Sequence, residues 1–111
     1  MQYLLLIYEN EKRFSQGYDP AEMGGYQAFG KEFSKNIKGS NALQPTGAAK
    51  TVRVRNGKPA NTDGPFAETK EQLGGYYLVE ATSIDEAMKI AAKIPGARFG
   101  SIEVRPIMQF S

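Results

Sequence analysis

Residues 2–9, which read QYLLLIYE, constrain the fold of this chain more than any other segment. A run of this length is typical of a buried strand, because a membrane span needs about 20 apolar residues. Side chains alternate along a strand, which gives this one two apolar faces. One face is formed by Tyr3, Leu5 and Ile7, and the other by Leu4, Leu6 and Tyr8. Both faces therefore need cover.

The same segment lacks the leading positive charges of a signal peptide, and Glu9 and Glu11 follow it at once. We therefore expect a cytoplasmic protein that does not associate with a membrane. The 111 residues are few enough for a single domain.

Composition excludes several kinds of chemistry. The chain has no cysteine and no histidine. Disulfides and catalytic thiolates are therefore excluded, and zinc, iron and copper sites are disfavoured, because these metals rely on imidazole and thiolate ligands. We expect no cofactor and no metal, and any acid–base work would fall to carboxylates, Lys or Tyr.

The charge balance argues against nucleic acid. There are 14 basic and 12 acidic residues, for a net charge of +2. A nucleic-acid binder usually concentrates its cations on one face. The nearest equivalent is the set Lys50, Arg53, Arg55 and Lys58 in a strand-like run.

The first helix is predicted to begin at Pro20, with Asp19 as its N-cap. Apolar residues then recur at helical spacing, and Gly39 is the predicted stop. This stripe comprises Met23, Tyr26, Phe29, Phe33 and Ile37.

Extended structure is predicted over residues 42–55, with a break near Pro45–Gly47. Asn56-Gly57 then predicts a hairpin turn. A long strand is expected over residues 73–81, where Gly74-Gly75 suggests a bulge or a close backbone approach.

The second helix is predicted to start at the capping box Ser83–Glu86 and to end at Pro95-Gly96. Its expected apolar stripe is Ile84, Ala87, Met88, Ala91 and Ala92. A last strand, residues 101–108, places Ile102 and Val104 on one face and Glu103 and Arg105 on the other.

The predicted order is β, α, β-hairpin, β, α, β, which indicates an α+β, ferredoxin-like antiparallel sheet with two helices on one face. The second apolar face of the first strand would then lie bare. Because monomers rarely expose a large apolar patch, we expect a homodimer that covers it.

A long segment, residues 62–77, reads TDGPFAETKEQLGGYY and resembles the signature of the YCII-related, or DGPF-domain, family. Residues 43–46 with 51–53, the segment 100–107 and the opening YLLLIY also resemble that family, so the likeness covers nearly the whole chain, residues 1–111, as one domain. The resemblance implies a ferredoxin-like fold that pairs into a dimeric α+β barrel in a bacterial cytoplasmic protein.

The resemblance does not imply one reaction. It implies lyase-like steps on small hydroxyaromatic compounds in some members, with a His–Asp pair proposed as their catalytic centre. Without histidine that pair cannot operate here, and only its aspartate half can be carried over, at Asp63. The resemblance also implies an association with extracytoplasmic-function sigma factors, through neighbouring genes.

Asp63 is the candidate catalytic residue, because a carboxylate at a strand end can abstract a proton or hold a ligand hydroxyl. The alternative is a turn residue, in which Asp63 bonds the backbone two residues on and Pro65 fixes the bend. The two roles can coexist.

Four further residues are candidate ligand-binding groups: Glu68, Lys70, Tyr76 and Arg105. Glu68 and Lys70 follow the bend and either line a polar pocket with Asp63 or form a solvated loop. Tyr76 and Tyr77 should point to opposite faces, one under the helices and one toward the dimer seam. Arg105 can clamp a carboxylate or phosphate, although a cross-strand pair of Glu103 with an arginine is the preferred interpretation.

Two functions remain open. The first is binding or transformation of a small polar or hydroxyaromatic molecule in a pocket at the dimer seam. The second is a non-catalytic regulatory or interaction module that works with a sigma factor.

Overall fold

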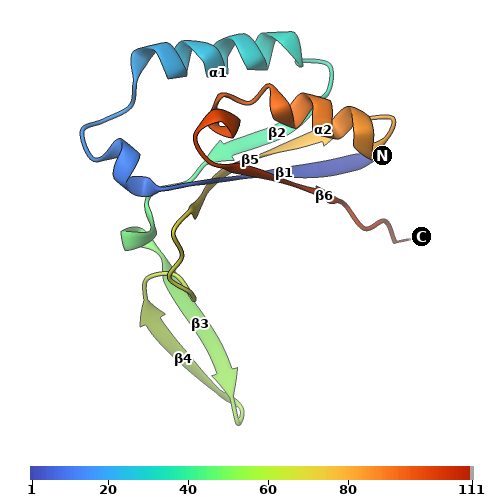
Figure 1. The fold of residues 1–111 in the computed structure, drawn as a ribbon. Helices are drawn as coiled ribbons and strands as arrows, with labels where there is room; N and C mark the ends of the chain where they lie inside the picture. The colour runs from blue at the N-terminus through green and yellow to red at the C-terminus, as the bar shows by residue number, and fades with distance from the viewer. Residues whose placement is uncertain (111) are drawn as a thin grey trace.

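The computed structural model describes residues 1–110 as one four-stranded antiparallel sheet with two helices on one face, and a separate two-stranded hairpin (Figure 1). The sheet order is β2-β5-β1-β6, with β1 Gln2–Glu9, β2 Ile37–Ala42, β5 Gln72–Glu80 and β6 Ser101–Pro106. The helices are α1 Pro20–Glu32 and α2 Ile84–Ala92. This is the predicted ferredoxin-like α+β fold.

The hairpin consists of β3 Lys50–Arg55 and β4 Lys58–Asp63 and forms its own sheet. Asn56 and Gly57 join the strands with φ of 54° and 77°, as the turn prediction requires. Short 3-10 turns, Glu11–Phe14, Thr46–Ala48 and Pro95–Arg98, complete the chain. No helix in the described part of the chain is long and apolar enough to cross a membrane.

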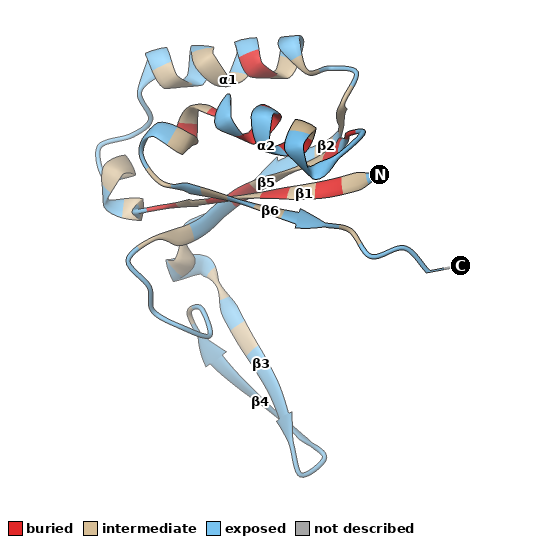
Figure 2. Ribbon diagram, turned by 45° about the vertical axis from the view of Figure 1, so that its right-hand side comes forward, coloured by how far each residue is buried: buried red, intermediate tan, exposed pale blue. Residues whose placement is uncertain are grey.

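The core lies between the sheet and the helices (Figure 2). In β1 the buried positions alternate with half-buried ones, as the two-faced pattern predicts. Leu5 is fully buried, and Tyr77 packs its ring edge-on to Phe29 of α1 with 4.9 Å between centroids. Ile90 and Ile94 fill the space under the second helix.

Both helices begin where predicted. The Asp19 carboxylate accepts a hydrogen bond from the Ala21 N–H at 3.0 Å, and Pro20 is the first helical residue. The Ser83 hydroxyl accepts from the Glu86 N–H at 3.1 Å. The predicted stripe of α2 is partly wrong: Ile84, Met88 and Ala92 are exposed, and Ile90 is the large buried side chain.

The predicted end of the first helix is also wrong. The helix stops at Glu32, and Ile37 opens the edge strand β2 instead of continuing the helical stripe. The backbone of Asn36 accepts from the Glu80 N–H at 2.8 Å, and its side chain donates to the Glu80 carbonyl at 3.0 Å. Pairing with β5 therefore wins over helix continuation in a segment, IKGSNA, that contains weak helix formers. Consequently β2 completes the main sheet, and the predicted hairpin stands apart from it.

Candidate functional site

The face of the sheet away from the helices is the principal candidate site, and we call it the open face. No helix within residues 1–110 covers it (Figures 1 and 2). The register places Leu4 beside Leu78 and Arg105, and Leu6 beside Tyr76 and Glu103. The open face comprises Leu4, Leu6, Tyr8, Asn41, Tyr76, Leu78, Glu103 and Arg105.

Its centre is apolar and its rim is polar. Leu4, Leu6 and Leu78 are half-buried and form the floor. The Tyr8 hydroxyl donates to Glu103 Oε1 at 3.2 Å on one side. On the other side, Asn41 Nδ2 donates to the Tyr76 hydroxyl at 2.9 Å. An apolar floor with a few oriented polar groups is typical of a small-molecule site.

Glu103 and Arg105 act on the Tyr8 hydroxyl. Partial burial, together with the hydrogen bond and negative charge of Glu103, raises the pKa of Tyr8, while Arg105 works in the opposite direction. Tyr8 therefore stays a neutral donor at physiological pH. Arg105 Nη1 lies 3.7 Å from Glu103 Oε2, so the expected partner of Glu103 proves to be on the same strand, not a neighbouring one.

Asp63 lies elsewhere, at the base of the hairpin. Its side chain is 87% exposed and accepts a hydrogen bond from Lys50 Nζ at 2.5 Å. The expected bond to the backbone two residues on does not form, because residue 65 is a proline without an N–H. The bend is made instead by Gly64, whose φ of 91° favours glycine and whose N–H donates to the Ala49 carbonyl at 2.7 Å.

Glu68 and Lys70 lie on the exposed loop that follows this bend. A pocket of about 260 Å³ opens at the loop, lined by Thr46, Pro65, Ala67, Glu68, Thr69 and Gln72. Glu11 anchors its edge, because its carboxylate accepts from the Thr46 N–H and hydroxyl at 2.7 and 2.8 Å. Glu68 thus faces a small polar pocket, whereas Lys70 stands in solvent.

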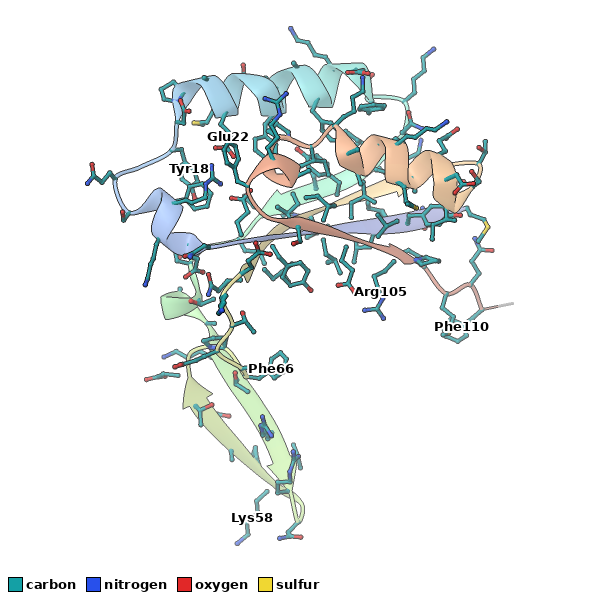
Figure 3. The ribbon with its side chains drawn as sticks, in the orientation of Figure 1. Tyr18, Glu22, Lys58, Phe66, Arg105 and Phe110 are labelled. Carbon is teal, nitrogen blue, oxygen red and sulfur yellow. The ribbon has the colours of Figure 1, made fainter. Side chains whose placement is uncertain are left out.

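Within one chain the five predicted residues fall into two groups. Tyr76 and Arg105 share the open face, on strands that flank β1. Asp63, Glu68 and Lys70 belong to the hairpin base and its loop. Tyr76 and Tyr77 take opposite sides, as predicted, and Tyr77 is the one that lies under the helices. Figure 3 shows the Arg105 side chain extending from β6 on the side of the sheet where the hairpin lies.

Sequence reasoning did not single out Tyr8, Asn41 and Glu103 as a joint rim. The alternation of β1 places Tyr8 on the correct face, but its contact with Glu103 joins residues 95 positions apart in sequence. Asn41 lies in β2, whose first residues fall within the helix that the sequence pattern predicts.

A second polar cluster, also missed, lies at the far end of β1. Glu9 is 5% exposed, and its carboxylate accepts from Arg13 Nη1 at 2.7 Å, while Arg13 Nη2 donates to Glu22 at 2.8 Å. Burial raises the pKa of Glu9 despite Arg13, and burial likewise raises that of Tyr26. Because the buried polar atoms are satisfied, this cluster fastens the start of α1 to the sheet.

A shallow groove of about 400 Å³ lies between α1 and α2 on the helix side. Lys93 and Glu32 bridge its rim at 3.4 Å. It holds none of the candidate residues. Within residues 1–110, no three acidic side chains come close enough together to hold a metal ion.

Comparison with known proteins places the chain in a family. The model of the YCII-related domain matches residues 1–111. The chain belongs to the YCII-related family. An uncharacterised protein of Rhizobium meliloti (strain 1021) is 40% identical over 114 residues, covering 96% of this YCII-related chain and 92% of the relative.

The YCII-related chain is also similar in fold to 5-chloro-2-hydroxyhydroquinone dehydrochlorinase from Burkholderia phenoliruptrix AC1100, solved in complex with 2,5-dihydroxybenzoquinone. The TM-score is 0.59 at 14% identity, covering 99% of this chain and 96% of that one. At such an identity the likeness shows the fold alone.

Proposed function

We propose that this YCII-related protein is a cytoplasmic homodimer that binds or transforms a small polar or hydroxyaromatic molecule on the open face. The observation that carries the proposal is the apolar floor of Leu4, Leu6 and Leu78 between two oriented tyrosine hydroxyls. The floor suits a planar ring, and the hydroxyls suit its oxygen substituents.

A second copy supplies the missing wall. Small-molecule sites typically enclose about 70–90% of the ligand surface, which a bare sheet face cannot do. A partner sheet facing the open face would enclose a ligand and cover the apolar floor at the same time. The site is therefore proposed to lie at the dimer seam.

Each predicted residue has a role in this proposal. Tyr76 and Arg105 hold the ligand, with Arg105 pairing a phenolate or carboxylate oxygen. Asp63 is proposed as base or ligand acceptor, with Glu68 and Lys70 beside it. These three residues can take part only if the hairpin base of one subunit lies against the open face of the other subunit. The bound dihydroxybenzoquinone of the similar fold supports the ligand class.

Calorimetric titration with 2,5-dihydroxybenzoquinone tests the binding step. Tyr76→Phe and Arg105→Met should each weaken binding by about tenfold, the worth of one hydrogen bond or charge contact. Tyr18→Phe and Arg98→Met are matched controls, because both residues are exposed and lie outside the open face. Equal affinity in all four variants would remove the open face as the site.

Turnover is tested separately with Asp63→Asn. If Asp63 is the base, this variant binds the quinone as the parent does but loses any conversion of hydroxylated aromatic substrates. Parent-like turnover in the variant would leave Asp63 without a catalytic role.

The second candidate, a non-catalytic module that works with an extracytoplasmic-function sigma factor, draws support from the exposed Val52 and Val54 on the hairpin. Affinity capture with the intact protein from its native host should then recover such a factor. Recovery of no sigma factor would contradict it.

A further inference from the structure

The hairpin β3–β4, residues 50–63, is the least supported part of the chain, and we call it the arm. Within residues 1–110, its two strands pair with each other and with no strand of the four-stranded sheet. Every residue of β4 is exposed, and so is every residue of β3 except Thr51 (Figure 2). The radius of gyration is 15.9 Å, against about 13 Å for a compact domain of this length. An isolated two-stranded hairpin is marginally stable in water, so the arm calls for a packing partner.

The two faces of the arm differ in chemistry. The register pairs Val52 with Asn61 and Val54 with Pro59, which gives one face that is mainly apolar toward the tip of the arm and carries the Lys50–Asp63 ion pair at its base. Val52 and Val54 are 63% and 59% exposed. The other face carries Arg53, Arg55 and Lys58 around Ala60 and Thr62. The apolar face is therefore the one that a partner would cover.

The arm stands on the same side of the main sheet as the open face. Figure 1 shows it descending from the sheet on the side opposite the helices, and Figure 3 shows Phe66 at its base on that side. Phe66 is 78% exposed. A body that covers the open face would therefore lie beside the arm.

Charge favours a second copy of this chain as that body. The arm holds four cations, Lys50, Arg53, Arg55 and Lys58, and one carboxylate, Asp63. The whole chain has a net charge of +2, so the arm at +3 leaves the remainder at −1. Arg53, Arg55 and Lys58 lie on the face of the arm opposite the valines, so they act at longer range, where a basic arm on a slightly acidic body attracts the body of another copy.

Symmetry points the same way. In a two-fold dimer each arm contacts the other body, so one closed arrangement covers both open faces and both arms. We infer that the arm of each subunit packs its Val52–Val54–Pro59 face against the body of a second copy of this chain, and that the site on the open face is enclosed only in the resulting dimer. This inference rests on the dimer of the proposed function.

Sedimentation and light scattering across a dilution series test the inference. The double variant Val52→Asp with Val54→Asp should raise the Kd of the dimer at least tenfold. The control is Ala60→Asp with Thr62→Asp, which adds the same charge on the opposite face of the arm and should change the Kd less than threefold. Equal effects of the two double variants, or a double valine variant that dimerises as the parent does, would overturn the inference.

A variant with a shortened arm distinguishes loss of the arm contact from misfolding as the cause of weakened dimerisation. In the parent protein the Asn56-Gly57 turn follows the pair Arg55–Lys58, and the pair Thr51–Thr62 has the same place in the strand alternation. Deleting residues 52–55 and 58–61 therefore joins the turn to Thr51 and Thr62 and leaves the register of the remaining strands unchanged. The main sheet should unfold cooperatively as before, while the dimer dissociates. A shortened protein that remains as tight a dimer as the parent overturns the role of the arm but leaves the open-face seam standing. A parent protein that is monomeric at micromolar concentration overturns both.

Discussion

The guanidinium of Arg13 lies over the ring of Phe99, with 3.9 Å between Cζ and the ring centroid. The same guanidinium holds the buried carboxylate of Glu9 and that of Glu22. Arg13 also lies 4.9 Å from the ring centroid of Phe14, so one cation contacts two carboxylates and two aromatic rings. It thereby joins the end of β1, the start of α1 and the turn before β6.

Replacing Arg13 by Met should destabilise the fold, because it leaves the Glu9 carboxylate buried without its cation. Removal of one partner of a buried pair costs about 3–5 kcal/mol, and the partial exposure of Arg13 reduces the expected loss to roughly 2–3 kcal/mol. Urea unfolding at neutral pH measures it. Lys93→Met removes an exposed partner of Glu32 and should cost less than about 1 kcal/mol. Equal losses would show that the cluster contributes no more than a surface pair.

Stability should fall with rising pH through the titration of Glu9. Burial raises its pKa above the ordinary value of 4.5, so the folded protein holds this proton more tightly than the unfolded chain does. The stability contributed by Glu9 is therefore fully present below pH 4.5 and is lost as the pH rises through the raised pKa. Glu9→Gln mimics the protonated acid and escapes this loss.

The measurement is the free energy of unfolding of Glu9→Gln minus that of the parent, followed from about pH 4 to about pH 8. This difference should move in favour of the variant as the pH rises. Glu32→Gln, at an exposed position, serves as the control. A difference that stays constant with pH would mean that Glu9 has an ordinary pKa.

Gly96→Ala and Gly24→Ala should have opposite effects. A Cβ at Gly96 would collide with Glu9 Oε1 and lie 2.8 Å from the Tyr26 hydroxyl, so the substitution should cost about 1–3 kcal/mol. A Cβ at Gly24, in the middle of α1, meets nothing within 4 Å and should add roughly 0.5–1 kcal/mol. Thermal unfolding compares the two, and a stabilised Gly96→Ala would contradict the described packing.

Asp63→Asn should leave the unliganded protein about as stable as the parent. Its side chain is 87% exposed and its partner Lys50 is 68% exposed, and such pairs contribute about 0–1 kcal/mol. The melting temperature measures this directly. A collapse of the variant would show that Asp63 supports the bend, and a loss of activity could then not be assigned to catalysis.

Local signals in the sequence were sufficient for much of the fold. The alternation in β1, the Asn56-Gly57 turn and the caps at Asp19 and Ser83 each act within a few residues, and the structure confirms them. The start of β2 could not be predicted, because Ile37 also fits the helical spacing of α1. Only the pairing of Ile37 with β5 decides between helix and strand.

The candidate site was less accessible from sequence. Strand alternation alone separates Tyr76 from Tyr77 and Arg105 from Val104, and the pairing of β5 and β6 with β1 then brings Tyr76 and Arg105 to one face. Their partners Asn41 and Glu103, and the burial of Glu9 beneath Gly96, depend on contacts between distant segments that leave no periodic pattern. The detachment of the arm was equally hidden, because a hairpin has the same local signals inside or outside a sheet.

The alternation of β1 divides the consequences of mutation by parity. At Leu5 a substitution disturbs the core beneath the helices, whereas at its neighbour Leu6 it alters only the open face. The odd-numbered residues of this strand therefore determine the stability of the fold, and the even-numbered residues determine which partner or ligand the open face binds. Sequence drift at even positions can change the companion or the ligand of this protein while its architecture is inherited unaltered.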